Sequence, residues 1–125
     1  MHGLHLTADL RECARGVALM TDTDALRELC LRAVADAGLA AVGELFHRFG
    51  TPSDRQSGIT GVVLLAESHL AVHTWPELGG VTIDAYVCNF GADNSQRAHQ
   101  LVDALIDAFA PARVRRQRLQ RSAPA

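Results

Sequence analysis

The sequence of 125 residues contains no lysine, since all twelve of its Lys and Arg residues are arginine. A pyridoxal phosphate enzyme needs a lysine for its internal aldimine, a Walker P-loop needs one for phosphate, and a Schiff-base aldolase needs its amine. The absence excludes these three classes. If the protein acts on amines, its electrophile must come from another source.

The chain also lacks long apolar runs, a secretory signal and a cysteine framework. No run approaches the roughly 20 apolar residues of a membrane helix, and the N-terminus lacks a basic-then-apolar pattern. A net charge of -2 gives no basic footprint for nucleic acid. Cys13, Cys30 and Cys88 are too widely spaced for a disulfide framework or a CxxC pair. These features predict a cytoplasmic protein without membrane or nucleic-acid partners, in which Cys13 and Cys30 are structural.

What is present predicts one domain, spanning residues 1–125, with one hydrophobic core, since 48% of the residues are apolar. Apolar residues alternate with polar ones over residues 3–11, which predicts a strand. Apolar residues at helical spacing predict a helix over 21–39, with Asp22 or Thr23 as its cap and Gly38 near its end. A second helix is predicted from Asp93 or Asn94 to Phe109.

The remaining segments complete an α+β pattern. A Gly/Pro/Ser-rich stretch at 50–58 predicts a loop. β-Rich sequence predicts further strands, three of them in an antiparallel meander, at 40–48, 59–67, 68–77 and 81–88, with a short one near 113–119. We expect a two-layer sandwich, an antiparallel sheet with both helices on one face. The arginine-rich segment 112–121 fits an acidic partner or, as we prefer, a basic edge strand or solvated tail.

Polar residues interrupt the apolar strand sequence at Glu67, Ser68, His69 and His73. Such residues are either hydrogen-bonded structural groups or line a site. On a helix, His69 and His73 would share a face as metal ligands, but in a strand they stand about 13 Å apart, so we expect no metal site. Ser68 lacks the G-x-S-x-G elbow, and Cys88 lacks the local signature of a cysteine protease. Spacing alone leaves the chemistry open.

The run ESHLAVHTWPE at 67–77, with Cys88 twenty residues after Ser68, resembles the short prokaryotic S-adenosylmethionine decarboxylases. GLHLTADL at 3–10 and HRF at 47–49 support the resemblance, which covers most of the chain. It implies that Ser68 attacks the carbonyl carbon of Glu67 and that the chain divides into residues 1–67 (the beta chain) and 68–125 (the alpha chain). Ser68 would become a pyruvoyl cofactor, which supplies the electrophile that lysine cannot.

The resemblance also implies roles for other residues. His73 would remove the α-proton of Ser68 during processing, since imidazole exchanges protons near neutral pH. Thr60 stands where relatives carry a serine that assists processing. Cys88 would return a proton to the substrate α-carbon, although a lone cysteine is more often a small buried hydrophobe. The resemblance further implies a homodimer with active sites near the subunit interface.

Three residues are candidates for binding a small amino-acid-type substrate. Phe49 and Trp75 could stack on adenine or face the sulfonium cation, and Glu77 could accept hydrogen bonds from ribose hydroxyls. An aromatic residue in a strand can equally belong to the core, so both interpretations stay open.

The expected function is decarboxylation of S-adenosylmethionine for spermidine synthesis. The loop between Phe49 and Thr60 is longer than the family leads us to expect, and loops carry specificity. Ornithine or arginine is therefore an alternative substrate for the same mechanism. A second alternative is a non-catalytic paralogue that never processes; a metal-binding protein built on His69 and His73 ranks last.

Overall fold

The computed structural model describes residues 1–13, 17–51, 57–89 and 91–123. Its elements, in chain order, are β1 (His2–Arg11), α1 (Val17–Thr21), α2 (Thr23–Asp36), β2 (Ala41–Arg48), β3 (Ile59–Leu65), β4 (Ser68–Trp75), the one-turn 3-10 helix η2 (Pro76–Leu78), β5 (Gly80–Cys88), α3 (Ser95–Phe109) and β6 (Arg113–Ser122). Most of the predicted longer loop falls on residues 52–56, which lie outside the described residues.

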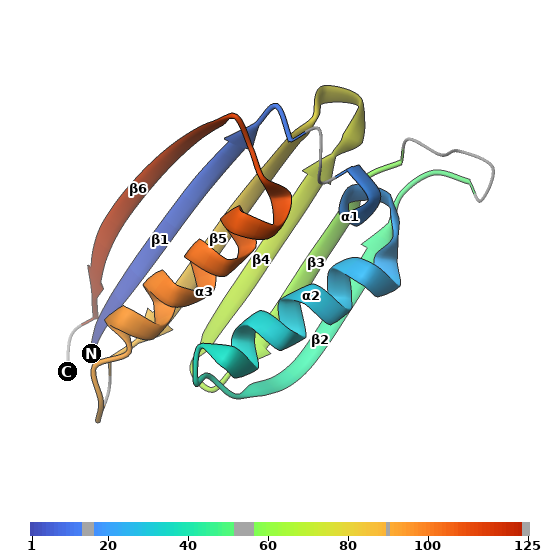
Figure 1. Cartoon of the computed structure of the whole chain (residues 1–125). Helices are drawn as coiled ribbons and strands as arrows, with labels where there is room; N and C mark the ends of the chain where they lie inside the picture. The colour runs from blue at the N-terminus through green and yellow to red at the C-terminus, as the bar shows by residue number, and fades with distance from the viewer. Residues whose placement is uncertain (14–16, 52–56, 90, 124–125) are drawn as a thin grey trace.

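The six strands form one antiparallel sheet in the order β2-β3-β4-β5-β1-β6. β2 to β5 follow one another as a meander, and β1 lies between β5 and β6. Both long helices, α2 and α3, cover the same face of the sheet (Figure 1). The predicted α+β two-layer sandwich is confirmed.

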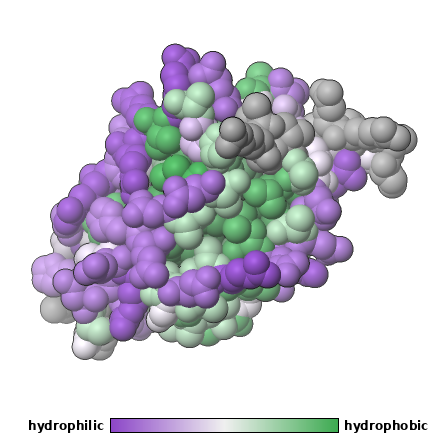
Figure 2. Space-filling model, in the orientation of Figure 1, coloured by the Kyte–Doolittle hydropathy of each residue, from purple (hydrophilic) through white to green (hydrophobic). Residues whose placement is uncertain are grey.

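The core lies between the helices and this face of the sheet. In β1 the alternation predicted from the sequence buries Leu4, Leu6, Ala8 and Leu10. α3 contributes buried residues at helical spacing, from Ala98 to Phe109. Burial of such side chains is the main favourable term in folding. Seen from the helix side, apolar side chains lie between polar outer surfaces (Figure 2).

The helix predicted over 21–39 is α2, with the predicted Asp22 as its N-cap, whereas the short helix α1 that precedes it was not predicted. Asp22 has extended backbone angles, φ -103° and ψ 104°, and its Oδ1 accepts a hydrogen bond from the Ala25 N–H at 3.1 Å. An N-cap of this kind begins a new helix, and so it ends the preceding turn. α2 ends before Gly38, whose φ of +79° is the left-handed conformation that glycine adopts most readily.

The arginine-rich segment forms β6, which is longer than the predicted strand and lies at the edge of the sheet. All its residues are exposed, and Arg116 pairs with Asp103 of α3 at 2.8 Å. Charged side chains on an edge strand discourage pairing with other chains. The interpretation as a basic edge strand is confirmed.

Candidate active site

The face of the sheet opposite the helices carries the polar and aromatic residues of the strands. Because side chains alternate between faces, burying Leu70 and Val72 of β4 against the helices directs His69, His73 and Trp75 to the other face. We call this the open face. In the described part of the chain no helix covers it (Figure 1).

Ser68 and Cys88 meet at one end of the sheet. β3 and β4 form a hairpin in which Leu65 pairs with Ser68, so the Glu67–Ser68 bond joins a two-residue turn to the first residue of β4. The Cys88 backbone N–H donates a hydrogen bond to Ser68 Oγ at 3.0 Å. The predicted nucleophile is therefore held against the strand that carries the predicted proton donor.

Thr60 and His73 meet toward the other end of the same strands. They are cross-strand partners on the open face, with Thr60 Oγ1 3.0 Å from His73 Nδ1. Both side chains are half-buried. The hydroxyl fixes the orientation of the imidazole, whichever of the two atoms carries the proton.

These two pairs are far apart within one chain. His73 lies five residues beyond Ser68 along β4, which at roughly 3.3 Å per residue is about 16 Å. The imidazole cannot span that distance along an extended strand. The structure thus brings together Ser68 with Cys88 and Thr60 with His73, but not the two pairs with each other.

A cleft of about 250 Å³ adjoins the Thr60–His73 pair and contains all three predicted binding residues, Phe49, Trp75 and Glu77. Phe49 is 52% exposed and Trp75 is 39% exposed, so neither belongs to the core. The alternative that these aromatic residues fill the core is therefore wrong. Their exposure at a cleft leaves their faces available to a flat or cationic ligand.

Thr74 supports this cleft from beneath and was not singled out from the sequence. Its buried Oγ1 accepts a hydrogen bond from the Ile59 N–H at 2.9 Å and donates one to the Met20 carbonyl at 2.8 Å. These bonds tie β4 to β3 and α1 between His73 and Trp75. The sequence holds no local signal for this role, because the partners are 15 and 54 residues away.

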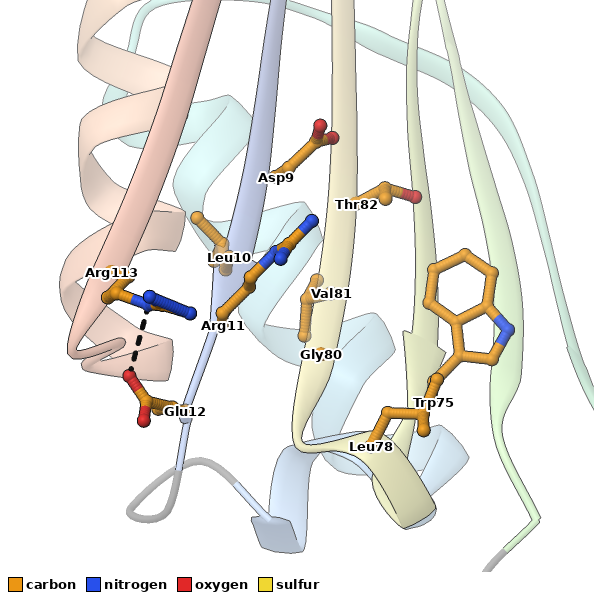
Figure 3. Close-up of a pocket in the computed structure, with 10 residues that line it drawn as sticks. All are labelled: Asp9, Leu10, Arg11, Glu12, Trp75, Leu78, Gly80, Val81, Thr82 and Arg113. Atoms are coloured by element: carbon orange, nitrogen blue, oxygen red, sulfur yellow. Dashed lines mark ion pairs between the residues drawn. The ribbon is translucent and has the colours of Figure 1, made fainter.

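A second cleft, of about 480 Å³, shares Trp75 with the first. Figure 3 shows Asp9 and Arg11 on β1, Thr82 on β5 and Trp75 at the far wall, with Arg113 3.3 Å from Glu12. In residues 3–11 the apolar positions of the alternation belong to the core, and the polar positions lie on the open face. That same alternation could have placed Asp9 and Arg11 beside the site.

A row of rings crosses the open face beside Cys88. Tyr86, the sole tyrosine of the chain, lies between His69, at 5.7 Å between ring centroids, and His5, at 6.1 Å and edge-on. His5 Nε2 is 3.1 Å from Asp84 Oδ1, and the Arg121 guanidinium lies 5.6 Å from the Tyr86 centroid. These contacts give the Ser68–Cys88 end a wall of aromatic and charged groups that the sequence did not reveal.

The two cysteines predicted to be structural are buried. Burial, and secondarily the negative charge of Glu44, raises the pKa of the Cys30 thiol to about 12. Burial also raises the pKa of the Cys13 thiol. Both groups are therefore held as neutral thiols, which suits packing and not nucleophilic chemistry.

The residues that the structure describes contain no helix long and apolar enough to cross a membrane. They also contain no group of three or more His, Cys, Asp or Glu residues that could hold a metal ion.

Fold and site together define a two-layer α+β protein whose predicted site residues gather in two groups, one around Thr60 and His73 on the open face and one where Ser68 meets Cys88 at an end of the sheet. The family model for S-adenosylmethionine decarboxylase matches residues 4–122. The chain belongs to the S-adenosylmethionine decarboxylase family.

Individual relatives of the chain support its assignment to this family. The chain is 39% identical over 104 residues to the S-adenosylmethionine decarboxylase proenzyme of Symbiobacterium thermophilum, covering 83% of this chain and 74% of that one. It is 37% identical over 116 residues to the proenzyme of Aquifex aeolicus, covering 92% and 77%. The crystal structure of the Aquifex aeolicus adenosylmethionine decarboxylase superposes with a TM-score of 0.80 at 34% identity, covering 98% of this chain and 92% of that chain.

Proposed function

We propose that this chain is a self-processing, pyruvoyl-dependent S-adenosylmethionine decarboxylase. The observation that carries the proposal is the Ser68–Cys88 pair: Ser68 follows a two-residue turn, and its Oγ is held by the Cys88 N–H. This arrangement supports attack on the adjacent Glu67 carbonyl. Family membership and the relatives' proenzyme names support the same activity.

Processing needs only groups of this chain and water. Ser68 Oγ would bond to the Glu67 carbonyl carbon as the C–N bond breaks, leaving an ester and a free amine. His73 would then take the Ser68 α-proton while the Glu67 carboxylate leaves. Hydrolysis with loss of ammonia would leave a pyruvoyl group on fragment 68–125.

The residues at the cut fit this cofactor. A pyruvoyl group supplies a carbonyl that condenses with an amine and accepts electrons as carbon dioxide leaves, which suits a chain without lysine. The Cys88 N–H donates to Ser68 Oγ in this structure and would remain beside the pyruvoyl group as a hydrogen-bond donor. The Cys88 side chain, on the open face by strand alternation, would return a proton to the product carbon.

A homodimer would bring the two halves of the site together. The open face exposes Leu45, Leu64 and Leu119 in addition to the cleft aromatics, which favours coverage by a second copy. Sheets pack face to face about 10 Å apart, and a two-fold axis repeats each contact. Thr60 and His73 of one protomer could then face Ser68 and Cys88 of the other, which would close the gap of about 16 Å along β4.

The cleft favours S-adenosylmethionine over arginine or ornithine. Exposed Phe49 and Trp75 offer faces to an adenine ring or a sulfonium cation, and Glu77 offers a carboxylate for hydroxyl groups. Arginine and ornithine have no ring to stack. Decarboxylation would yield an aminopropyl donor for spermidine synthesis.

The experiment begins with intact-protein mass spectrometry of the purified full chain under denaturing conditions. Fragments 1–67 and 68–125, the second with a pyruvoyl mass, are expected, and Ser68→Ala should stay whole. Release of labelled carbon dioxide is then compared for S-adenosylmethionine, arginine and ornithine. An uncleaved chain without turnover contradicts the proposal and favours the non-catalytic paralogue; cleavage with turnover of arginine or ornithine alone replaces the substrate.

A further inference from the structure

The residue before the predicted cut has an unfavourable backbone conformation. Glu67 has φ +58°, in the left-handed region that favours glycine. For an L-residue this conformation brings Cβ close to the residue's own carbonyl oxygen, the oxygen of the peptide bond that would break. The strain therefore lies next to the predicted reaction centre.

The hairpin around Glu67 departs from the turns that two-residue hairpins favour. Such turns have positive φ at the first central residue, or at both, because this backbone twist matches that of the strands. Here φ is not positive at the first central residue, Ala66, and only the second, Glu67, has the left-handed angle. Pairing on both sides holds the turn, with Leu65 opposite Ser68 and Ser68 Oγ bound by the Cys88 N–H. The sheet thus fixes a turn that the local sequence does not favour.

We propose that Glu67 is a positioning residue whose left-handed conformation stores strain that promotes self-cleavage, an inference that rests on the proposed function. In the acyl shift, a C–O bond forms between Ser68 Oγ and the Glu67 carbonyl carbon. The C–N bond breaks, and the Oγ proton ends on the freed amine. As the carbonyl carbon becomes tetrahedral, its oxygen moves relative to Cβ, and after cleavage residue 67 is a free terminus. Strain present in the intact chain is thereby lost along the reaction.

The test replaces Glu67 with residues that tolerate positive φ to different degrees. Glu67→Gly removes the strain, and we expect cleavage to be about five- to tenfold slower, the size of effect that one such conformation supplies. Glu67→Asn should be intermediate, since asparagine accepts this region better than glutamate. Glu67→Gln keeps the strain and removes only the charge, so it should be cleaved faster than Glu67→Gly, and the difference between the two rates is the effect of the backbone conformation. Time courses of full-length chain by intact mass give the rates.

A stability measurement separates stored strain from simple loosening of the turn. In a Ser68→Ala background, which stays intact, Glu67→Gly should raise Tm, because glycine fits φ > 0 without cost. A loosened turn would lower it. Ala110→Gly, at φ +47° and in no predicted site, is the matched control: it should raise Tm and leave the cleavage rate unchanged.

The outcomes are distinct. Cleavage of Glu67→Gly at the normal rate, equal slowing in Glu67→Gln, or a fall in Tm would each overturn the inference while leaving the proposed function intact. If the unaltered chain never cleaves, the proposed function fails. Even in that case, an unchanged or lower Tm for Glu67→Gly in the Ser68→Ala background would show separately that the turn stores no strain.

Discussion

Thr60 Oγ1 lies 3.0 Å from His73 Nδ1 across two adjacent strands of the sheet. The bond occupies one ring nitrogen and leaves Nε2 as the other proton-exchanging atom. Because both residues are strand residues, the sheet fixes the direction in which the imidazole acts. A hydroxyl at position 60 is therefore expected to matter more than its methyl group.

Replacing Thr60 tests this orientation. Thr60→Ser keeps the hydroxyl and should process normally, whereas Thr60→Val keeps the shape and should process about tenfold more slowly, since one oriented hydrogen bond is lost. Intact mass against time gives both rates. Equal rates for the two variants would show that the hydroxyl plays no part.

Mixed dimers test the proposed sharing of the site. The His73→Ala chain retains Ser68, and the Ser68→Ala chain retains His73; each alone should stay uncut. Co-expressed, the His73→Ala chain should be cut, because the other subunit supplies the imidazole across the interface. Differently tagged chains identify the cut product by mass. A His73→Ala chain that stays whole in isolated mixed dimers would contradict the shared site.

Thr74 should matter for stability. Thr74→Val keeps the volume but leaves the Ile59 N–H and the Met20 carbonyl without their buried partner, which should cost about 2 kcal/mol of unfolding free energy. Urea unfolding in a Ser68→Ala background measures it on an intact chain. Thr82→Val, at a half-buried residue of β5, is the comparison and should change stability by less than about 0.5 kcal/mol.

Alkaline pH should expose the burial of Cys30. Its pKa rises from an ordinary 9.0 to about 12 in the folded protein, so above pH 9 the unfolded thiol ionises while the folded one stays protonated. The unfolded state then binds fewer protons, and the free energy of unfolding falls as pH rises through the window from 9 to 12, by about 1.4 kcal/mol per unit.

Cys30→Ala removes the part of this pH-dependent loss of unfolding free energy that comes from the Cys30 thiol. Urea unfolding of Ser68→Ala and Ser68→Ala/Cys30→Ala chains at pH 8 and pH 10, with reductant, gives the difference. The pH-dependent loss should be about 1.4 kcal/mol smaller without the thiol. The same loss in both chains would mean that Cys30 titrates normally.

The sequence predicted the layers well because burial periodicity is local. The alternation around Leu4 and Leu6 and the helical spacing that ends at Phe109 each identify one element and its buried face. The cap at Asp22 was also predicted, because an aspartate directly before an apolar run at helical spacing is a local signal. The short helix α1 was not predicted, because its five residues are too few to show an apolar repeat.

The site was predictable in composition but not in arrangement. The motif run marked Ser68, His73 and Cys88, and the structure gathers Phe49, Trp75 and Glu77 at one cleft. These residues fall into two groups, Ser68 with Cys88 and His73 with the cleft residues. The distance between the groups follows from the rise per residue of the extended strand β4. The His5–Asp84 contact and the role of Thr74 depend on pairings between segments distant in sequence, which no local pattern encodes.

If the chain is cut as proposed, the position of β1 between β5 and β6 ties the two fragments together. β1 belongs to fragment 1–67, while both of its neighbours belong to fragment 68–125, so β6 would be joined to the sheet only through a strand of the other polypeptide. The two pieces would thus be interleaved and could not part without dismantling the sheet. Once denatured, the two pieces would have to meet again by collision, so each protomer of the cut form should re-form faster at higher protein concentration, while the folding of an uncut protomer needs no such encounter.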